Sequence, residues 1–321
     1  MNNLTQTLHY LTPSPTDFVE IAVLERAGFV ESRHRGIAAV TSADGKLIDH
    51  LGSPKRVIYP RSSIKPLQAV AMQRAGLVLA DDDWAIVAAS HHASEAHMRL
   101  VSKVLAGAGL DDSALQCPVA WPADQAARSA AKEPTKVAFN CSGKHAGFLA
   151  TCVAAGWDTA TYLETEHPLQ VLIREILEEY SGERILHSTI DGCGAPLHMM
   201  TVEGLARAIG AFAVRNQDLA ASMLRNPWIV GSEDNTDAAL MKEGIVCKLG
   251  AEGVLVAATE DGHGLAVKVA DGSHRPAPFA LVGLLQRNAL IDDAAAARIL
   301  ERVAVPVTGG AQTLGGMRAA F

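Results

Sequence analysis

The stretch RSSIKPLQA, at residues 61–69, marks the point where predicted strands give way to predicted helices. Pro66 falls in the first turn of a helix, where its missing N–H costs little, and Gly76 is a typical helix end. Ser62 and Lys65 are three residues apart, so they would share one face of a helical turn. A buried lysine with a lowered pKa can accept a serine proton, which is the logic of the S-x-x-K hydrolase motif. The alternative is a helix-capping serine followed by a solvated lysine.

Strands are predicted on both sides of this point. Those before it cover residues 18–25, 30–40 and 47–52, with a hairpin turn at Asp44-Gly45. Those near the C-terminal end cover residues 246–249, 253–258 and 265–270, and helices follow at 276–286 and 292–303. Between them the pattern is mainly helical, for example at 95–108, 202–212 and in the segments that end at Gly156 and begin at His167.

This order of elements predicts an α+β fold. We expect one antiparallel sheet, built from N- and C-terminal strands, with a helical insert. The predicted organisation is a single unit over residues 1–321, with a sheet subdomain at 18–60 plus 243–321 and a mainly helical subdomain at 61–242.

Composition excludes several classes of protein. Hydrophobic residues make up 49% and charged residues 20% of the 321, as in a globular protein. The net charge of -7 and the absence of a basic stripe predict no nucleic-acid partner and no membrane partner. No apolar run is long enough to span a bilayer, and residues 1–17 lack the features of a secretory signal. Five scattered cysteines favour a reducing compartment, so we expect a cytoplasmic location.

Two glycine-rich blocks contain candidate metal ligands. NCSGKH, at residues 140–145, contains Cys141 and Lys144, and DGCGAP, at residues 191–196, contains Asp191 and Cys193. Two thiolates and a carboxylate suit zinc, whereas lysine is an unusual ligand that must be neutral to bind. The alternative is a pair of buried thiols beside a loop.

These blocks occur in a fixed order with SH at residues 90–91, HPLQ at 167–170, KLGAEG at 248–253 and KVADG at 268–272. From about residue 18 onward the chain resembles the rhizobial, thermolabile type of L-asparaginase, the asparaginase II sequence family. The resemblance implies a fold similar to serine β-lactamases and penicillin-binding enzymes. It also implies a homodimeric amidohydrolase, acting on linear amides, that converts L-asparagine to L-aspartate and ammonia.

The resemblance implies two catalytic pairs, Ser62 with Lys65 and Ser90 with Lys268. Ser62 is expected to be the nucleophile and Lys65 its base, because amide hydrolysis needs both and an acid for the leaving ammonia. Exchange of the roles of Ser62 and Ser90 stays open.

The resemblance also implies one zinc ion per chain. Its expected ligands are Cys141, Lys144, Asp191 and Cys193. Four protein ligands would close the site, so we expect the metal to position substrate or stabilise structure rather than to activate water.

Candidate substrate-binding residues adjoin these groups: Arg61, His91, Asn140, His145 and Gly192. Arg61 is suited to bind the substrate carboxylate, and a structural ion pair is its alternative role. The histidines flank candidate catalytic residues, and either has a loop hydrogen bond as the alternative.

The chain departs from the family pattern at three places. Ala93 and Ser94 stand where a glycine and a glutamate are usual, Phe139 replaces a second asparagine, and residues 230–237 lack a usual arginine. These departures leave the substrate more open than the reaction, so L-glutamine or an asparagine derivative is an alternative. A β-lactamase or peptidoglycan peptidase is disfavoured because Ser-Asp-Asn and Lys-Thr-Gly motifs are missing. The remaining alternative is an inactive homologue that binds zinc or an amino acid.

Overall fold

The computed structural model describes residues 11–321, and its largest sheet is antiparallel with seven strands. The strand order is β13-β1-β2-β10-β9-β8, and β3 pairs with β2 off this path. The strands are β1 (Val19–Arg26), β2 (Phe29–Thr41), β3 (Leu47–Leu51), β8 (Val246–Gly250), β9 (Val254–Ala258), β10 (Gly264–Val269) and β13 (Met317–Ala319). Strands from both ends of the chain therefore form one antiparallel sheet, as predicted.

The long strand β2 joins the two halves of this sheet. Residues 29–36 pair with β1, and residues 36–41 pair with β10. Its first half alternates between exposed and partly buried side chains, whereas its last six residues are all buried. This change is expected where a strand passes from one solvated face to a position covered on both faces.

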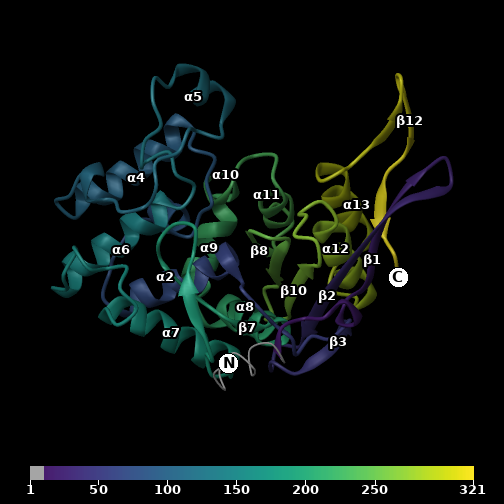
Figure 1. Ribbon diagram of the computed structural model, residues 1–321, viewed down its shortest axis with the longest axis horizontal. Coiled ribbons are helices and arrows are strands. Elements are labelled where there is room, and N and C mark those ends of the chain that lie inside the picture. The colour runs from purple at the N-terminus through teal and green to yellow at the C-terminus, as the bar shows by residue number, and fades with distance from the viewer. Residues whose placement is uncertain (1–10) are drawn as a thin grey trace.

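Helices cover both faces of the sheet, as Figure 1 shows. Helix α8 (Val202–Arg215) packs on β2, β9 and β10, and α12 (Ala277–Arg287) packs on the sheet from the side of α13 (Asp293–Arg302). Close approach of α8 depends on Gly210, where a Cβ would lie 2.5 Å from the carbonyl oxygen of Gly262. The sheet is therefore the middle layer of this part of the molecule.

A mainly helical region lies beside the sheet, on the left of Figure 1. Its helices are α2 (Lys65–Arg74), α3 (Asp81–Val87), α4 (Glu95–Gly107), α5 (Gln125–Ala130), α6 (Ser142–Ala155), α7 (Pro168–Ser181), α9 (Gln217–Arg225), α10 (Pro227–Val230) and α11 (Thr236–Met241). Helix α6 ends at Gly156, whose φ of +70° suits a C-terminal glycine, as predicted.

Short elements complete the fold. They are η1 (Pro15–Asp17), η2 (Arg61–Ile64) and η3 (Asp112–Ala114), with strands β4 (Val57–Ile58), β5 (Ser188–Ile190), β6 (Pro196–His198), β7 (Met200–Thr201), β11 (Val307–Gly309) and β12 (Gln312–Gly315). The paired hairpins β1–β2 and β11–β12 project from the sheet on the right of Figure 1. The predicted subdomain boundaries stay a prediction.

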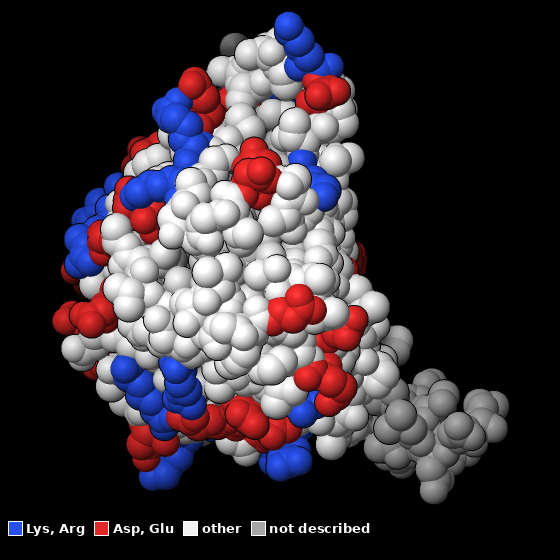
Figure 2. Space-filling view, turned by 90° about the vertical axis from the view of Figure 1, so that its left-hand side faces the viewer, with Lys and Arg blue, Asp and Glu red and all other residues white. Residues whose placement is uncertain are grey.

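Surface charge, helix length and the N-terminal residues relate to the expectations of no nucleic-acid partner, no membrane partner and no secretory signal. Figure 2 shows a face with an uncharged centre and interspersed positive and negative residues around it. Among the described residues, none of the helices combines the length and apolar character needed to cross a membrane. The prediction of no secretory signal concerns residues 1–17, of which residues 1–10 lie outside the described part.

Candidate active site

The serine of the S-x-x-K motif lies in a short turn that is held between the sheet and the helical region. Ser62 belongs to η2, and Lys65 begins α2 with Pro66 in the first turn, as predicted. Strand β8 packs directly against η2, because a Cβ at Gly250 would lie 2.4 Å from the carbonyl oxygen of Pro60. The side chain of Ser62 stays partly exposed, so substrate can reach its hydroxyl.

The amine of Lys65 lies against Ser90 rather than against Ser62. Lys65 Nζ donates to Ser90 Oγ at 3.1 Å and to the carbonyl oxygen of Ala89. Because Lys65 stands at the junction of η2 and α2, its long side chain runs inward to the segment after α3 instead of along the turn. We predicted that Lys65 pairs with Ser62 and that Ser90 pairs with Lys268. In this structure Lys65 contacts Ser90 instead.

Burial makes Lys65 an unusual amine. Its residue is 1% exposed, and this burial lowers its pKa to about 8. A thiolate at Cys141 opposes the shift, while the positive charges of Lys248 and Lys144 add to it. A larger neutral fraction at neutral pH follows, which suits a proton acceptor.

Two thiols and a second lysine lie next to this group. Lys144 Nζ donates to Cys193 Sγ at 3.0 Å, and Cys141 Sγ is 4.0 Å from Ser62 Oγ. The hydrogen bond between the thiols lowers the pKa of Cys141 well below its usual range and raises that of Cys193. The pair therefore holds one negative charge between two lysines. We call Ser62, Lys65, Ser90, Cys141, Lys144 and Cys193 the reactive cluster.

Charge within this cluster is balanced around Lys144. Burial alone would lower the pKa of Lys144, but negative charge at Cys193, Cys141 and Asp191 raises it above its usual value. Its ammonium ion thus serves as a counter-charge to the thiolate of this pair.

Three of the four predicted metal ligands have converged. Cys141, Lys144 and Cys193 are each at most 4% exposed, and two sulfurs with one nitrogen form a donor set that fits a soft cation such as zinc. The carboxylate of Asp191 is paired with another residue, since its Oδ1 accepts from Arg61 Nε at 2.7 Å. Within residues 11–321, no group of three His, Cys, Asp or Glu side chains is placed to bind a metal, so the set depends on Lys144.

Lys268, near the end of β10, hydrogen-bonds to the backbone and not to Ser90. Its Nζ donates to the carbonyl oxygens of Glu252, at 2.8 Å, and Val269. Lys268 and the Arg61–Asp191 ion pair border a cavity of about 640 Å³. We call this cavity the Arg61 pocket. The predicted partners Ser90 and Lys268 therefore do not hydrogen-bond to each other in the structure. Lys268 instead lines the pocket, where it can contact a ligand.

Among the predicted substrate-binding residues, two histidines have internal partners. His91 Nε2 is 2.9 Å from Ser142 Oγ, and His145 Nδ1 is 2.8 Å from the hydroxyl of Tyr162. Both rings are at most 1% exposed, and burial lowers the pKa of each well below its usual range. They are neutral rings that hold the start of α6 in place. Arg61, Gly192 and Asn140 lie nearer the surface, and the first two line the Arg61 pocket.

Left-handed backbone occurs beside three of the predicted catalytic residues. Arg61 precedes Ser62 with φ +55°, and Ala93 follows the Ser90 block with φ +57°. Glu252, whose carbonyl binds Lys268, has φ +62°. Non-glycine residues pay a steric cost in this region, and such strain gathers at functional sites.

An ion pair that sequence reasoning missed lies behind the cluster. Lys248 Nζ is 3.1 Å from Asp237 Oδ2, and both side chains are fully buried. Asp237 Oδ1 also accepts from the backbone N–H of Leu249 at 2.8 Å, which ties α11 to β8. A lysine inside an apolar strand was the available indication, since a buried lysine needs a partner.

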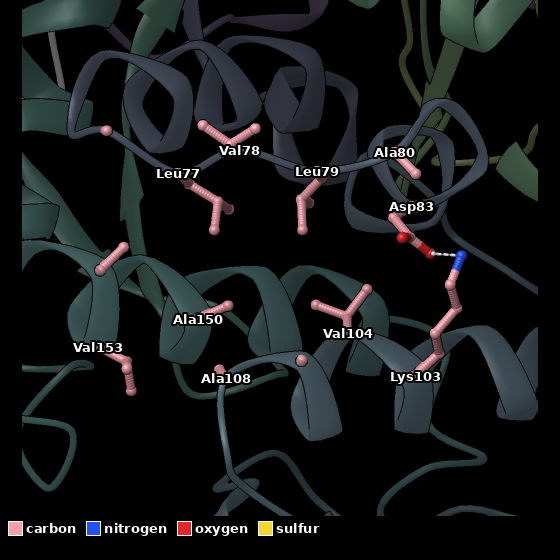
Figure 3. Close-up of a pocket in the computed structure, with 13 residues that line it drawn as sticks. Leu77, Val78, Leu79, Ala80, Asp83, Lys103, Val104, Ala108, Ala150 and Val153 are labelled. Carbon is pink, nitrogen blue, oxygen red and sulfur yellow. Dashed lines mark ion pairs between the residues drawn. The ribbon is translucent and has the colours of Figure 1, made fainter.

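A second cavity lies away from these residues, between the α2–α3 connection, α4 and α6. Figure 3 shows Leu77, Leu79 and Val104 directed into it. Its volume is about 530 Å³, and its charged residues Lys103 and Asp83 pair with each other at 2.9 Å. The apolar walls offer no nucleophile, so the reactive cluster stays the candidate active site.

Comparison with known proteins identifies a family. Residues 22–319 match the family described as L-asparaginase II. No curated protein matches the chain. Two solved structures, entitled crystal structure analyses of Mglu in its glutamate form and in its native form, resemble it with TM-scores of 0.48 and 0.46 and 14% identity each. The matches cover 89% and 90% of this chain and 67% and 72% of those chains. Likeness at this level says nothing about activity.

Proposed function

The chain belongs to the L-asparaginase II family, and from this premise we propose that it hydrolyses the side-chain amide of L-asparagine to L-aspartate and ammonia. The observation that carries the proposal is the buried Lys65 amine, 3.1 Å from Ser90 Oγ, in the same cluster as Ser62. An amine without water around it, next to hydroxyls, is what a Ser-Lys amidohydrolase needs.

We assign the attack to Ser62 because it is the less buried of the two serines and directly follows Arg61, which lines the Arg61 pocket. Its hydroxyl oxygen bonds to the amide carbon as its proton passes to the Lys65 amine. Cys141 neighbours both residues, since it lies 4.0 Å from Ser62 Oγ and hydrogen-bonds with Lys65. The transfer from Ser62 to Lys65 then needs either Ser90 as a relay or a movement of the Lys65 side chain toward Ser62.

The remaining steps use the same groups. The ammonium form of Lys65 returns the proton to the amide nitrogen, the C–N bond breaks, and ammonia leaves. Water then attacks the Ser62 ester, gives one proton to Lys65, and releases L-aspartate while Ser62 regains its hydrogen. Arg61 is placed to bind the α-carboxylate, because Asp191 occupies only its Nε.

A zinc ion fits into this proposal through Cys141, Lys144 and Cys193. When bound, it would supply a fixed positive charge that holds the two loops beside Ser62. Elemental analysis of protein purified without chelator tests this site, and protein without stoichiometric zinc would remove it from the proposal.

Other features that the resemblance implies are carried forward as predictions. They are a homodimer, a cytoplasmic location and a fold similar to serine β-lactamases. Light scattering on the purified chain tests the first of them.

The test of function is ammonia release from L-asparagine and L-glutamine by wild type, Ser62→Ala and Ser90→Ala. We expect Ser62→Ala to lose roughly 10³-fold or more in kcat and Ser90→Ala about 10²-fold. Ser63→Ala is the matched control, because Ser63 Oγ bonds to the carbonyl oxygen of Pro60. Turnover of asparagine by Ser62→Ala at the wild-type rate would exclude Ser62 as the nucleophile. Folded wild type that releases no ammonia would refute the function.

A further inference from the structure

The Arg61 pocket is larger and more apolar than L-asparagine requires. We propose that it accommodates an acyl group on the α-amino nitrogen, so that the preferred substrates are N-acyl-L-asparagines with an apolar acyl chain. This inference rests on the proposed function, because it extends the same site beyond the amino acid that it binds.

The size of the cavity is the first argument. Its volume of about 640 Å³ lies within the range of roughly 300–1,000 Å³ that proteins use for drug-sized ligands. Free L-asparagine is a much smaller molecule and would leave most of this volume to water. A substrate with an additional group would fill it.

The charges that line the pocket indicate whether the additional group is attached to the α-amino nitrogen or to the α-carboxylate of asparagine. Asp191 Oδ1 is already bound by Arg61 Nε at 2.7 Å and by the N–H of Gly192 at 2.8 Å. Of the two carboxylates among the described lining residues, Asp191 is therefore already neutralised by a cationic partner. Glu252, the other carboxylate of the lining, is exposed to solvent.

A substrate carboxylate, by contrast, has two donors. Arg61 keeps the N–H groups that Asp191 does not use, and Lys268 uses two of its three N–H groups on backbone carbonyls. The pocket thus fits a free α-carboxylate and an uncharged α-nitrogen, which is the arrangement of an N-acyl amino acid.

The wall next to these charges is apolar. Leu197 and Met199 are nearly buried in it, whereas Ile190 lies at the rim with 71% of its surface exposed. Walls that are mainly apolar, with a few charged groups that fix orientation, are usual in sites for small molecules. Each methylene that the acyl chain buries there raises affinity roughly fourfold.

The chain connects residues of the pocket directly to residues of the reactive cluster at two places. Arg61 directly precedes Ser62, and Asp191 is two residues before Cys193. A substrate whose carboxylate is held at Arg61 can therefore direct its side-chain amide toward Ser62 while its acyl chain extends along the wall.

The test is kcat/KM for ammonia release from L-asparagine, N-acetyl-L-asparagine, N-hexanoyl-L-asparagine and the dipeptide L-asparaginyl-L-leucine. We expect N-hexanoyl-L-asparagine to exceed free L-asparagine by at least about tenfold, with the N-acetyl compound between them. Ile190→Ser should reduce the ratio of hexanoyl to free substrate several-fold. Leu186→Ser, which removes an exposed leucine outside the pocket lining, should keep the ratio.

Three results would overturn the inference while the proposed function stands. They are a preference for free L-asparagine, a preference for the dipeptide, which is modified at the carboxyl end, and an unchanged ratio in Ile190→Ser. Absence of ammonia from every substrate would instead refute the proposed function itself.

Discussion

The reactive cluster and the Arg61 pocket adjoin each other but are built in opposite ways. In the cluster, Lys65, Lys144 and Cys193 are almost without solvent contact, and each has a specific polar partner within the protein. In the pocket, Ile190 and Glu252 are exposed, and cationic groups keep unused hydrogen-bond donors. We therefore expect the cluster to determine the reaction and to tolerate little change, and the pocket to determine the substrate and to vary with small cost to folding.

The largest expected effect on stability comes from removing the negative charge of Asp237 behind the reactive cluster. Asp237→Asn leaves the fully buried Lys248 ammonium without its counter-charge at 3.1 Å. We expect the free energy of unfolding to fall by about 3–5 kcal/mol, because a buried charge without a partner is strongly unfavourable. Urea denaturation of wild type and variant measures this difference.

The control is an ion pair of the same types at the surface. Glu233→Gln removes the partner of Lys242, 3.0 Å away, at a glutamate whose side chain is 64% exposed. Its loss should stay below about 1 kcal/mol. Equal losses in the two variants would mean that water reaches Lys248 and that the cluster is less closed than the comparison states.

The pH dependence of stability tests whether water is excluded from the protein interior behind the apolar wall of the Arg61 pocket. His198 follows Leu197 of that wall, and burial lowers its pKa from 6.5 to about 4. Below pH 6.5 the unfolded chain takes up this proton, whereas the folded chain resists until about pH 4. Stability from the neutral ring is therefore present above pH 6.5 and lost as the pH falls toward 4, by roughly 3 kcal/mol in full.

Urea denaturation at pH 7 and pH 4.5 measures this loss. His198→Gln should lose roughly 2–3 kcal/mol less than wild type between these two pH values. His50→Gln, at an exposed histidine of β3, should behave as wild type. A wild-type acid response in His198→Gln would place the proton uptake elsewhere.

The sequence predicted the sheet well because its strands have a clear β pattern and turn residues. The Asp44-Gly45 turn and the runs that became β9 and β10 are such cases. Strand β13 was missed because Met317–Ala319 is too short to show a period, and pairing with β1 forms it. Helix α11 was missed since Thr236–Met241 is too short to show an amphipathic pattern, and its start is capped by Asn235.

For the candidate site, the sequence predicted which residues lie together better than it predicted which of them contact each other. Lys144 and Cys193, 49 residues apart, were placed in one set, and they are in contact. The contact of Lys65 with Ser90 was not predicted, because spacing within a turn says nothing about where a long side chain ends. Lys248 and Asp237 form a pair only after β8 and α11 pack together, so the position of Lys248 in an apolar strand could indicate a buried partner but not that the partner is Asp237.

The smallest expected effect concerns Ala93, which stands beside the cluster where glycine is usual. Its φ of +57° costs an alanine about 1–2 kcal/mol, which Ala93→Gly would relieve. The glycine loses about 0.4–1 kcal/mol through greater freedom of the unfolded chain, and about 0.8 kcal/mol through one buried methyl group. These contributions nearly cancel, so unfolding free energy should change by less than about 1 kcal/mol in either direction. A loss above about 2 kcal/mol would show instead that the Ala93 methyl group is part of the packing that keeps the cluster closed.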